Sequence, residues 1–315
     1  MAGDSKLTAE AYLRKAREEI VAWEAARRGY FARMGDLMFT PAARWTERMV
    51  PKPIQNAASH AIEKTLLITA QAGGFSIDRK ALERERSASI GRKRTLVPRL
   101  RACDALARKF WRNHCGYAAA QGAATGVAGL AGFIADIPLI LSIAIREIRT
   151  IGLCYGFSAT SAGETDYLLH VLRAGSSSEY EVRHESLSIL RKLEPGLRRS
   201  TTMQSLSGEK ASRVRYLMTI QEYAKSLGIQ LIRRNALQLI PLAGIVTSAS
   251  FNALYANDIG RAAYMCYRRR FIEDALASPP KVSVPRRQPR RSERRPSRAT
   301  AVTGPRDRKR APQDQ

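Results

Sequence analysis

Four histidines are the first candidates for metal binding or acid–base chemistry in this chain, namely His60, His114, His170 and His184. None stands in an H-E-x-x-H motif, or at another spacing that would put two ligands on one metal ion. Cys115 follows His114 and Glu185 follows His184, but adjacent side chains on a helix point in different directions. We therefore predict ordinary helix histidines and no metal site.

The four cysteines are the next candidates, and they are Cys103, Cys115, Cys154 and Cys266. They form no C-x-x-C pair and stand in apolar helical contexts, which is typical of free thiols in a reducing compartment. There is no G-x-S-x-G elbow, and the glycine run that begins at Gly122 precedes no Lys-Ser/Thr pair and follows no predicted strand. The sequence therefore predicts a protein that is not an enzyme and that has no cofactor.

Asp136 lies in the longest apolar passage, Gly122 to Gly156. It has two interpretations, a buried acid that transfers protons or the N-cap of a helix, and Pro138 in the following turn favours the cap. We thus predict a hairpin in which a glycine-lined helix reverses at Asp136 into an apolar helix that ends at Tyr155-Gly156. The stripe of small residues that admits a second backbone consists of Gly122, Gly126, Gly129 and Gly132.

Hydrophobic periodicity elsewhere predicts an all-α fold, a single bundle of nine to ten helices without a strand pair or fixed repeat. The last predicted helix, Gly244 to Leu276, would pack on the hairpin, and Asn252 is one of its packing positions. Asp104 lies on the edge of a helical face, where it would pair with Arg101 or Arg108 or take a buried structural role. The helical domain spans residues 1–278, and residues 279–315 are predicted to be a disordered basic tail rich in proline and arginine.

The net charge of +25 is the outlier of the composition. The tail carries twelve basic and three acidic residues, and a second basic stretch includes a predicted surface turn at Gly91 to Arg94. Such a charge favours anionic lipid headgroups, nucleic acid or an acidic protein as partners. The side chains expected to contact an anionic surface are Arg92, Lys93, Arg94, Arg286, Arg287, Arg290, Arg291, Arg294 and Arg295.

Residues 118–145 contain no Lys or Arg, and this run exceeds the roughly 20 apolar residues that a membrane span needs. A simple span is disfavoured because a carboxylate at the bilayer centre costs about 2.5–3.5 kcal/mol. The hairpin is therefore either buried in a soluble bundle or inserted partway into one leaflet. The polar N-terminal stretch lacks the apolar core of a signal peptide, so we expect a cytoplasmic protein.

One set of residues forms a recognisable combination, and it consists of Gly122 to Gly126, Ala135 to Pro138, Arg146, Tyr155, Gly156, Ile240 to Gly244, Asn252, Ala262 and Arg268 to Phe271. This combination resembles the signature of the EcsC protein family over roughly Leu7 to Leu276, most closely over Leu96 to Gly156. Members of this family are bacterial, take their name from a gene beside an ABC transporter, and have no settled biochemical activity. The resemblance implies an α-helical, membrane-associated protein, with an ABC transporter component as a candidate partner and with no catalytic residues.

Two functions remain open. The first is a membrane-peripheral helical protein, held to the inner face of the cell membrane by its basic faces and tail, and accessory to a transporter or to envelope and secretion processes. The second is a nucleic-acid-associated protein that uses the same charges on phosphates, without sequence specificity because no reading module is present. The oligomeric state is not indicated by the sequence.

Overall fold

The computed structural model describes residues 8–26, 52–71, 77–125, 129–158, 161–177, 179–200, 220, 223–224 and 244–277. Within these ranges the fold is all-α, as predicted, although its eight helices are fewer than the nine to ten expected. The helices are α1 (Ala9–Ala25), α3 (Lys52–Gln71), α4 (Arg79–Ile90), α5 (Leu96–Thr125), α6 (Gly129–Tyr155), α7 (Ala162–Ser176), α8 (Tyr180–Ser200) and α10 (Gly244–Ala277).

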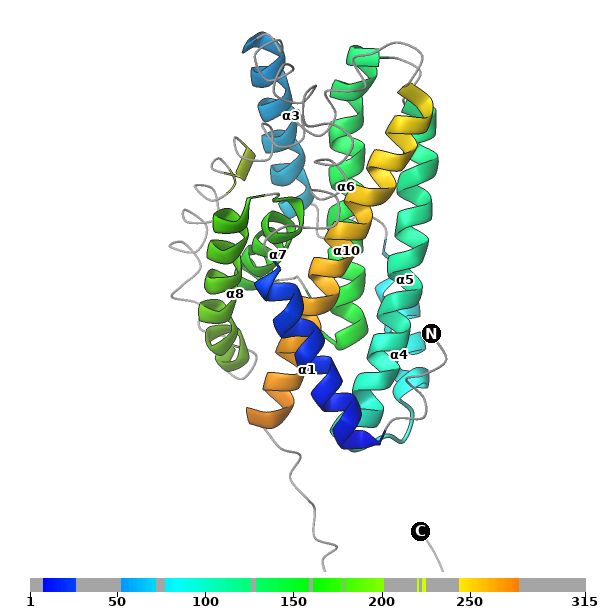
Figure 1. Cartoon of the computed structure of the whole chain (residues 1–315), viewed down its shortest axis with the longest axis vertical. Coiled ribbons are helices and arrows are strands. Elements are labelled where there is room, and N and C mark those ends of the chain that lie inside the picture. Colours follow the sequence, from blue (N-terminus) through cyan, green and yellow to red (C-terminus); the bar gives the residue numbers. More distant parts are fainter. Residues whose placement is uncertain are drawn as a thin grey trace, which may run out of the picture. The chain divides into compact units, whose positions relative to one another are not determined.

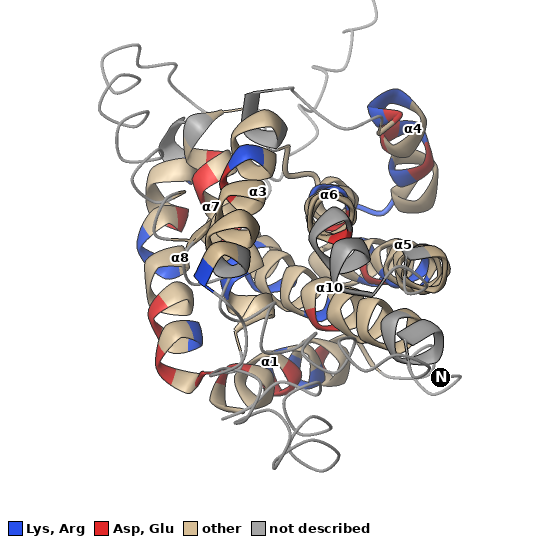
Figure 2. Ribbon diagram, turned by 90° about the horizontal axis from the view of Figure 1, so that it is seen from above, with Lys and Arg blue, Asp and Glu red and all other residues tan. Residues whose placement is uncertain are grey.

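Helix α10 is the central element of the bundle. It packs most extensively against α5 and also contacts α6, α7 and α1 (Figures 1 and 2). The stretch from Ala262 to Phe271 is enclosed on all sides, since all ten of its residues are buried. The chain divides into two compact units, Met1–Pro279 and Pro280–Gln315, and all eight helices belong to the first. The predicted disordered tail lies outside the described residues.

Several helix ends follow from local sequence. Thr8 caps α1 and Asp78 caps α4, because each side chain accepts a hydrogen bond from the backbone N–H three residues later, at 3.3 and 2.9 Å. Ser161 caps α7 in the same way, as its capping-box sequence predicts. Gly156 ends α6 with a φ of 92°, a left-handed conformation that glycine adopts without strain.

The predicted reversal at Asp136 is wrong. Helix α6 begins at Gly129 and continues without a break through Asp136 and Pro138 to Tyr155. A hairpin does exist, because α5 and α6 pack against each other and only residues 126–128 separate them. The chain thus reverses about ten residues earlier than predicted, within the glycine-rich run and not after it.

The earlier reversal of the chain also separates the glycines of the predicted stripe. Gly122 is buried near the end of α5, Gly129 begins α6 and Gly132 lies within α6, whereas Gly126 is outside the described residues. The four glycines therefore do not share one helix. The pair Pro195-Gly196 predicts a helix end, but helix α8 runs through Pro195 to Ser200.

The apolar run of α6 faces the core. Ile137, Ile140 and Leu141 are buried, while Leu139 between them is 49% exposed. None of the described helices combines the length and the apolarity that a membrane crossing requires. Helical periodicity also predicts helices at residues 40–49, 207–227 and 229–239. The first and the last lie outside the described residues, as does most of the second.

Candidate functional site: three buried arginines and a basic-rimmed groove

Three consecutive arginines of α10, Arg268, Arg269 and Arg270, are all buried, and each meets a carboxylate from a different part of the bundle. Successive side chains of a helix point about 100° apart, so one short run reaches three neighbours at once. A buried cation is tolerated only where it is paired and hydrogen-bonded. These contacts therefore hold the surrounding helices in fixed positions around α10.

Arg268 pairs with Asp104 of α5, whose side chain is fully buried. Arg268 Nη2 lies 2.9 Å from Asp104 Oδ2. The hydroxyls of Tyr12 in α1 and Tyr155 at the end of α6 each donate to the same carboxylate at 2.6 Å. Four helices thus meet at one carboxylate. Of the two alternatives for Asp104, the structure shows the buried structural role, and the observed ion pair is with Arg268, which was not among the predicted partners.

Arg269 and Arg270 make the corresponding contacts to α8, α1 and α7. Arg269 Nη2 lies 2.7 Å from Glu194 of α8, and Arg269 also pairs with Glu24 of α1. Arg270 binds Glu164 of α7 with two parallel hydrogen bonds of 2.8 and 2.6 Å. Such bidentate pairs are among the stronger ion pairs in proteins.

Burial shifts the pKa values of several tyrosines, cysteines and histidines of the core toward their uncharged forms. It raises the pKa of Tyr155 well above the usual value and raises that of Cys103 to about 11. Burial also raises the pKa of Cys115 and Cys266 to about 12, and lowers that of His170 to about 4. These thiols are protonated at neutral pH, which is typical of inert structural cysteines.

Asp136 contributes a second polar contact inside the bundle. Its two carboxylate oxygens accept hydrogen bonds from Gln121 Nε2 of α5 at 2.5 Å and from Asn252 Nδ2 of α10 at 3.0 Å. Asp136 does not need to cap a helix, because side chains from two neighbouring helices satisfy it. The structure thus joins two residues that the sequence analysis named separately, Asp136 and Asn252.

Glu147 of α6 is the exception among the buried carboxylates. Its side chain is fully buried, and within the described part of the chain neither oxygen has a hydrogen-bond partner. Desolvation raises its pKa well above the usual value. No role was predicted for this residue, although a glutamate within the apolar run of α6 was a visible signal.

Replacing Gly260 with alanine is expected to lower the free energy of unfolding by about 1–3 kcal/mol, since it overpacks the core around Glu147. A Cβ there would lie 2.2 Å from Trp111 Cδ1 and 2.3 Å from Glu147 Oε1. Gly116→Ala is the matched control, because nothing lies within 4 Å of its added methyl, and helix propensity favours it by about 0.5–1 kcal/mol. Urea unfolding of both variants measures the difference, and equal stabilities would contradict the packing argument.

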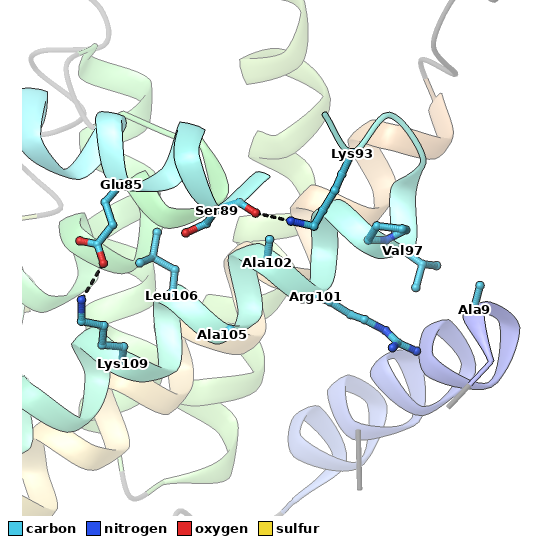
Figure 3. A pocket seen from close by; sticks show the side chains of 11 residues that line it. Ala9, Glu85, Ser89, Lys93, Val97, Arg101, Ala102, Ala105, Leu106 and Lys109 are labelled. Carbon is cyan, nitrogen blue, oxygen red and sulfur yellow. Dashed lines mark hydrogen bonds and ion pairs between the residues drawn. The ribbon is translucent and has the colours of Figure 1, made fainter. Parts of the chain in front are cut away.

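A groove between α4 and α5 has a volume of about 740 Å³ (Figure 3). Small apolar side chains, including Ala102 and Ala105, form its floor. Lys93, Arg101 and Lys109 are its cations, and Glu85 is its only acidic lining residue. Its rim continues into the α4–α5 turn, where Arg92, Lys93 and Arg94 are all exposed.

The sequence profile of the EcsC protein family matches residues 14–272. The chain belongs to the EcsC protein family. It is 26% identical over 173 residues to the uncharacterized protein YdbA of Bacillus subtilis (strain 168). This match covers 55% of the chain and 59% of YdbA. It is 31% identical over 130 residues to Protein EcsC of the same organism, covering 41% of this chain and 50% of that protein. No solved structure matches the chain.

The matches thus span 59% of the length of YdbA and 50% of the length of Protein EcsC. The EcsC match includes both motif regions that the sequence analysis quoted, up to Arg268–Phe271. In the structure, the two regions lie together, because Asp136 bonds to Asn252 and Tyr155 shares Asp104 with Arg268. The motif residues Asp136, Asn252, Tyr155 and Arg268 therefore belong to the framework of this fold.

The remaining predicted anion contacts divide into two groups. Arg92, Lys93 and Arg94 form an exposed turn after Gly91, which has a φ of 52°. The tail arginines between 286 and 295 lie outside the described residues.

Gly244 was predicted as a helix-packing residue. The structure describes only its place as the first residue of α10. Within the described ranges, no group of three His, Cys, Asp or Glu residues is placed to hold a metal ion.

Proposed function

We propose that this EcsC-family protein is a non-enzymatic, membrane-peripheral protein that binds anionic lipid surfaces at the inner face of the cell membrane. The observation that carries the proposal is the exposed run Arg92–Lys93–Arg94, beside a groove with further cations, in a chain of net charge +25. Each basic residue near an anionic leaflet contributes about 1 kcal/mol of attraction. Basic residues of the tail add to this attraction.

The internal arrangement supports a binding role over a catalytic one. The buried arginines are each paired with a carboxylate, and the four thiols have raised pKa values, so these groups are used for packing. The finer role, as an accessory to an ABC transporter or to envelope and secretion processes, rests on the family resemblance alone. A transporter complex or a secretion process is the context in which a membrane-bound helical protein of this family would act.

Neutralising the turn tests the proposal. We expect Arg92→Gln/Lys93→Gln/Arg94→Gln to lower the partition coefficient onto phosphatidylglycerol vesicles by up to roughly 100-fold, since about 3 kcal/mol of attraction is removed. Vesicle co-sedimentation measures this coefficient, with phosphatidylcholine vesicles as the neutral comparison. The triple variant Arg14→Gln/Lys15→Gln/Arg17→Gln is the matched control, because it removes the same charge from the exposed side of α1.

Three outcomes would contradict the proposal. In the first, the protein stays in the supernatant when it is mixed with anionic vesicles. In the second, both triple variants lose vesicle binding equally. In the third, duplex DNA displaces the protein from vesicles at equal phosphate concentration. The last outcome would instead favour the nucleic-acid alternative, in which binding depends steeply on salt and not on the lipid. A chain ending at residue 278, measured in parallel, reports the contribution of the tail.

A further inference from the structure

We propose that the α4–α5 groove binds one anionic phospholipid molecule, with its phosphate at the Lys93–Arg101 end and an acyl chain along the alanine floor. This inference rests on the proposed function and sharpens it. In addition to the general attraction to a charged surface, the protein would then have a defined site for a single lipid. The class of ligand follows from the shape, the charge distribution and the size of the groove.

The floor is one face of α5. Its residues recur at steps of three or four, the spacing at which helical side chains share a face. This face consists of Pro98, Arg101, Ala102, Ala105, Leu106 and Lys109. Because Ala102 and Ala105 carry only methyl groups, an apolar channel remains between α5 and Ser89 and Glu85 of α4 (Figure 3).

The two ends of the groove differ in charge. At one end, Lys109 Nζ lies 2.6 Å from Glu85 Oε1, so that cation is already neutralised. At the other end lie Lys93, which donates to the backbone carbonyl of Ser89, and Arg101. The Arg101 guanidinium is 4.6 Å from the centroid of the Tyr12 ring, and this contact orients it without cancelling its charge. The second end is thus the electropositive one.

An amphiphile fits this combination better than a simple ion or a neutral lipid. A bare phosphate would leave the alanine floor in water, and a ligand without negative charge would gain nothing from Lys93 and Arg101. The volume of about 740 Å³ lies within the range of about 300–1,000 Å³ for small-molecule sites. Eleven residues line the groove, whereas a stable protein interface uses about 20–30 residues on each side. The occupant we infer is therefore a lipid and not a protein.

A short-chain lipid below its critical micelle concentration separates this site from general membrane attraction. Titration calorimetry of the full chain with dihexanoyl phosphatidic acid is expected to give one site. Dihexanoyl phosphatidylcholine and inorganic phosphate are each expected to bind at least tenfold more weakly. Lys93→Gln is expected to weaken phosphatidic acid binding several-fold, because Lys93 lies at the phosphate end.

Ala105→Trp fills the channel without changing the charge, and is expected to weaken phosphatidic acid binding at least tenfold. Ala120→Trp is the matched control, since Ala120 is also an exposed alanine of α5 but does not line the groove. Thermal unfolding of both variants verifies that each is folded. The lipid affinity of Ala120→Trp should equal that of the unmodified protein.

The results distinguish this inference from the proposed function. If anionic vesicles bind but soluble phosphatidic acid does not, or if Ala105→Trp binds it normally, the groove site is wrong and surface attraction stands. If inorganic phosphate binds as tightly as phosphatidic acid, the site recognises an anion without an acyl chain, which also overturns the inference. Tighter binding of an acidic amphipathic peptide, blocked by Ala105→Trp, would assign the groove to a protein partner instead. Soluble lipid binding without vesicle binding would uphold the groove and refute the membrane-peripheral role.

Discussion

Replacing Asp104 with alanine is expected to lower the free energy of unfolding by about 3–5 kcal/mol, the cost of removing one partner of a buried ion pair. The change leaves the Arg268 guanidinium buried and removes the acceptor for two tyrosine hydroxyls. Because Tyr12 is one of them, the loss should also loosen α1. Urea unfolding followed by circular dichroism measures the first effect, and hydrogen exchange within α1 measures the second.

A double-mutant cycle with Arg268→Met separates the ion pair from the packing of the two side chains. The double variant Asp104→Ala/Arg268→Met should be more stable than the sum of the single losses indicates, since it no longer contains an unpaired buried charge. A loss below about 1 kcal/mol for Asp104→Ala is typical of a weak, exposed ion pair. It would contradict the conclusion that this carboxylate holds four helices together.

Glu147→Gln is expected to stabilise the protein at neutral pH, by an amount that increases with pH. Desolvation raises the pKa of Glu147 in the folded state well above its usual value of 4.5. Below that value both states are protonated and the residue has no effect. At higher pH the unfolded chain releases this proton and the folded chain does not, so stability falls by about 1.4 kcal/mol per pH unit up to the folded pKa. Glutamine, which has a similar shape and no proton to release, avoids this loss.

Urea unfolding of both proteins at pH 5, 6, 7 and 8 measures the prediction as a widening difference between the two unfolding free energies. Glu83→Gln is the matched control, because it makes the same chemical change on an exposed side chain of α4. A difference between Glu147→Gln and the unmodified protein that stays constant from pH 5 to 8 would show that Glu147 is ionised in the folded state. In that case a positive charge near the carboxylate would stabilise its ionised form and offset the cost of desolvation.

Local sequence was sufficient for the elements whose signals lie within a few residues. The caps at Thr8, Asp78 and Ser161 depend on a side chain and a backbone group three residues apart, so their pattern is visible without a fold. The end of α6 at Tyr155 followed from Gly156, whose left-handed backbone stops a helix. The all-α class followed from helical periodicity along the whole chain, and the exposed turn at Arg92–Arg94 followed from its charge and the glycine before it.

The tertiary structure decided which buried charges meet. Arg268 and Asp104 are far apart in the sequence, and a pair so distant has no local spacing that would reveal it. The sequence analysis also assigned Asp136 to a cap, because Asp followed by Pro138 is a common helix start. Gln121 and Asn252 from two neighbouring helices satisfy its carboxylate instead, and α6 continues through it. A helix cap is worth about 1 kcal/mol at such a position, whereas two hydrogen bonds from neighbouring helices, one of them buried, are together worth more. The packing of α5, α6 and α10 therefore determined the course of the chain.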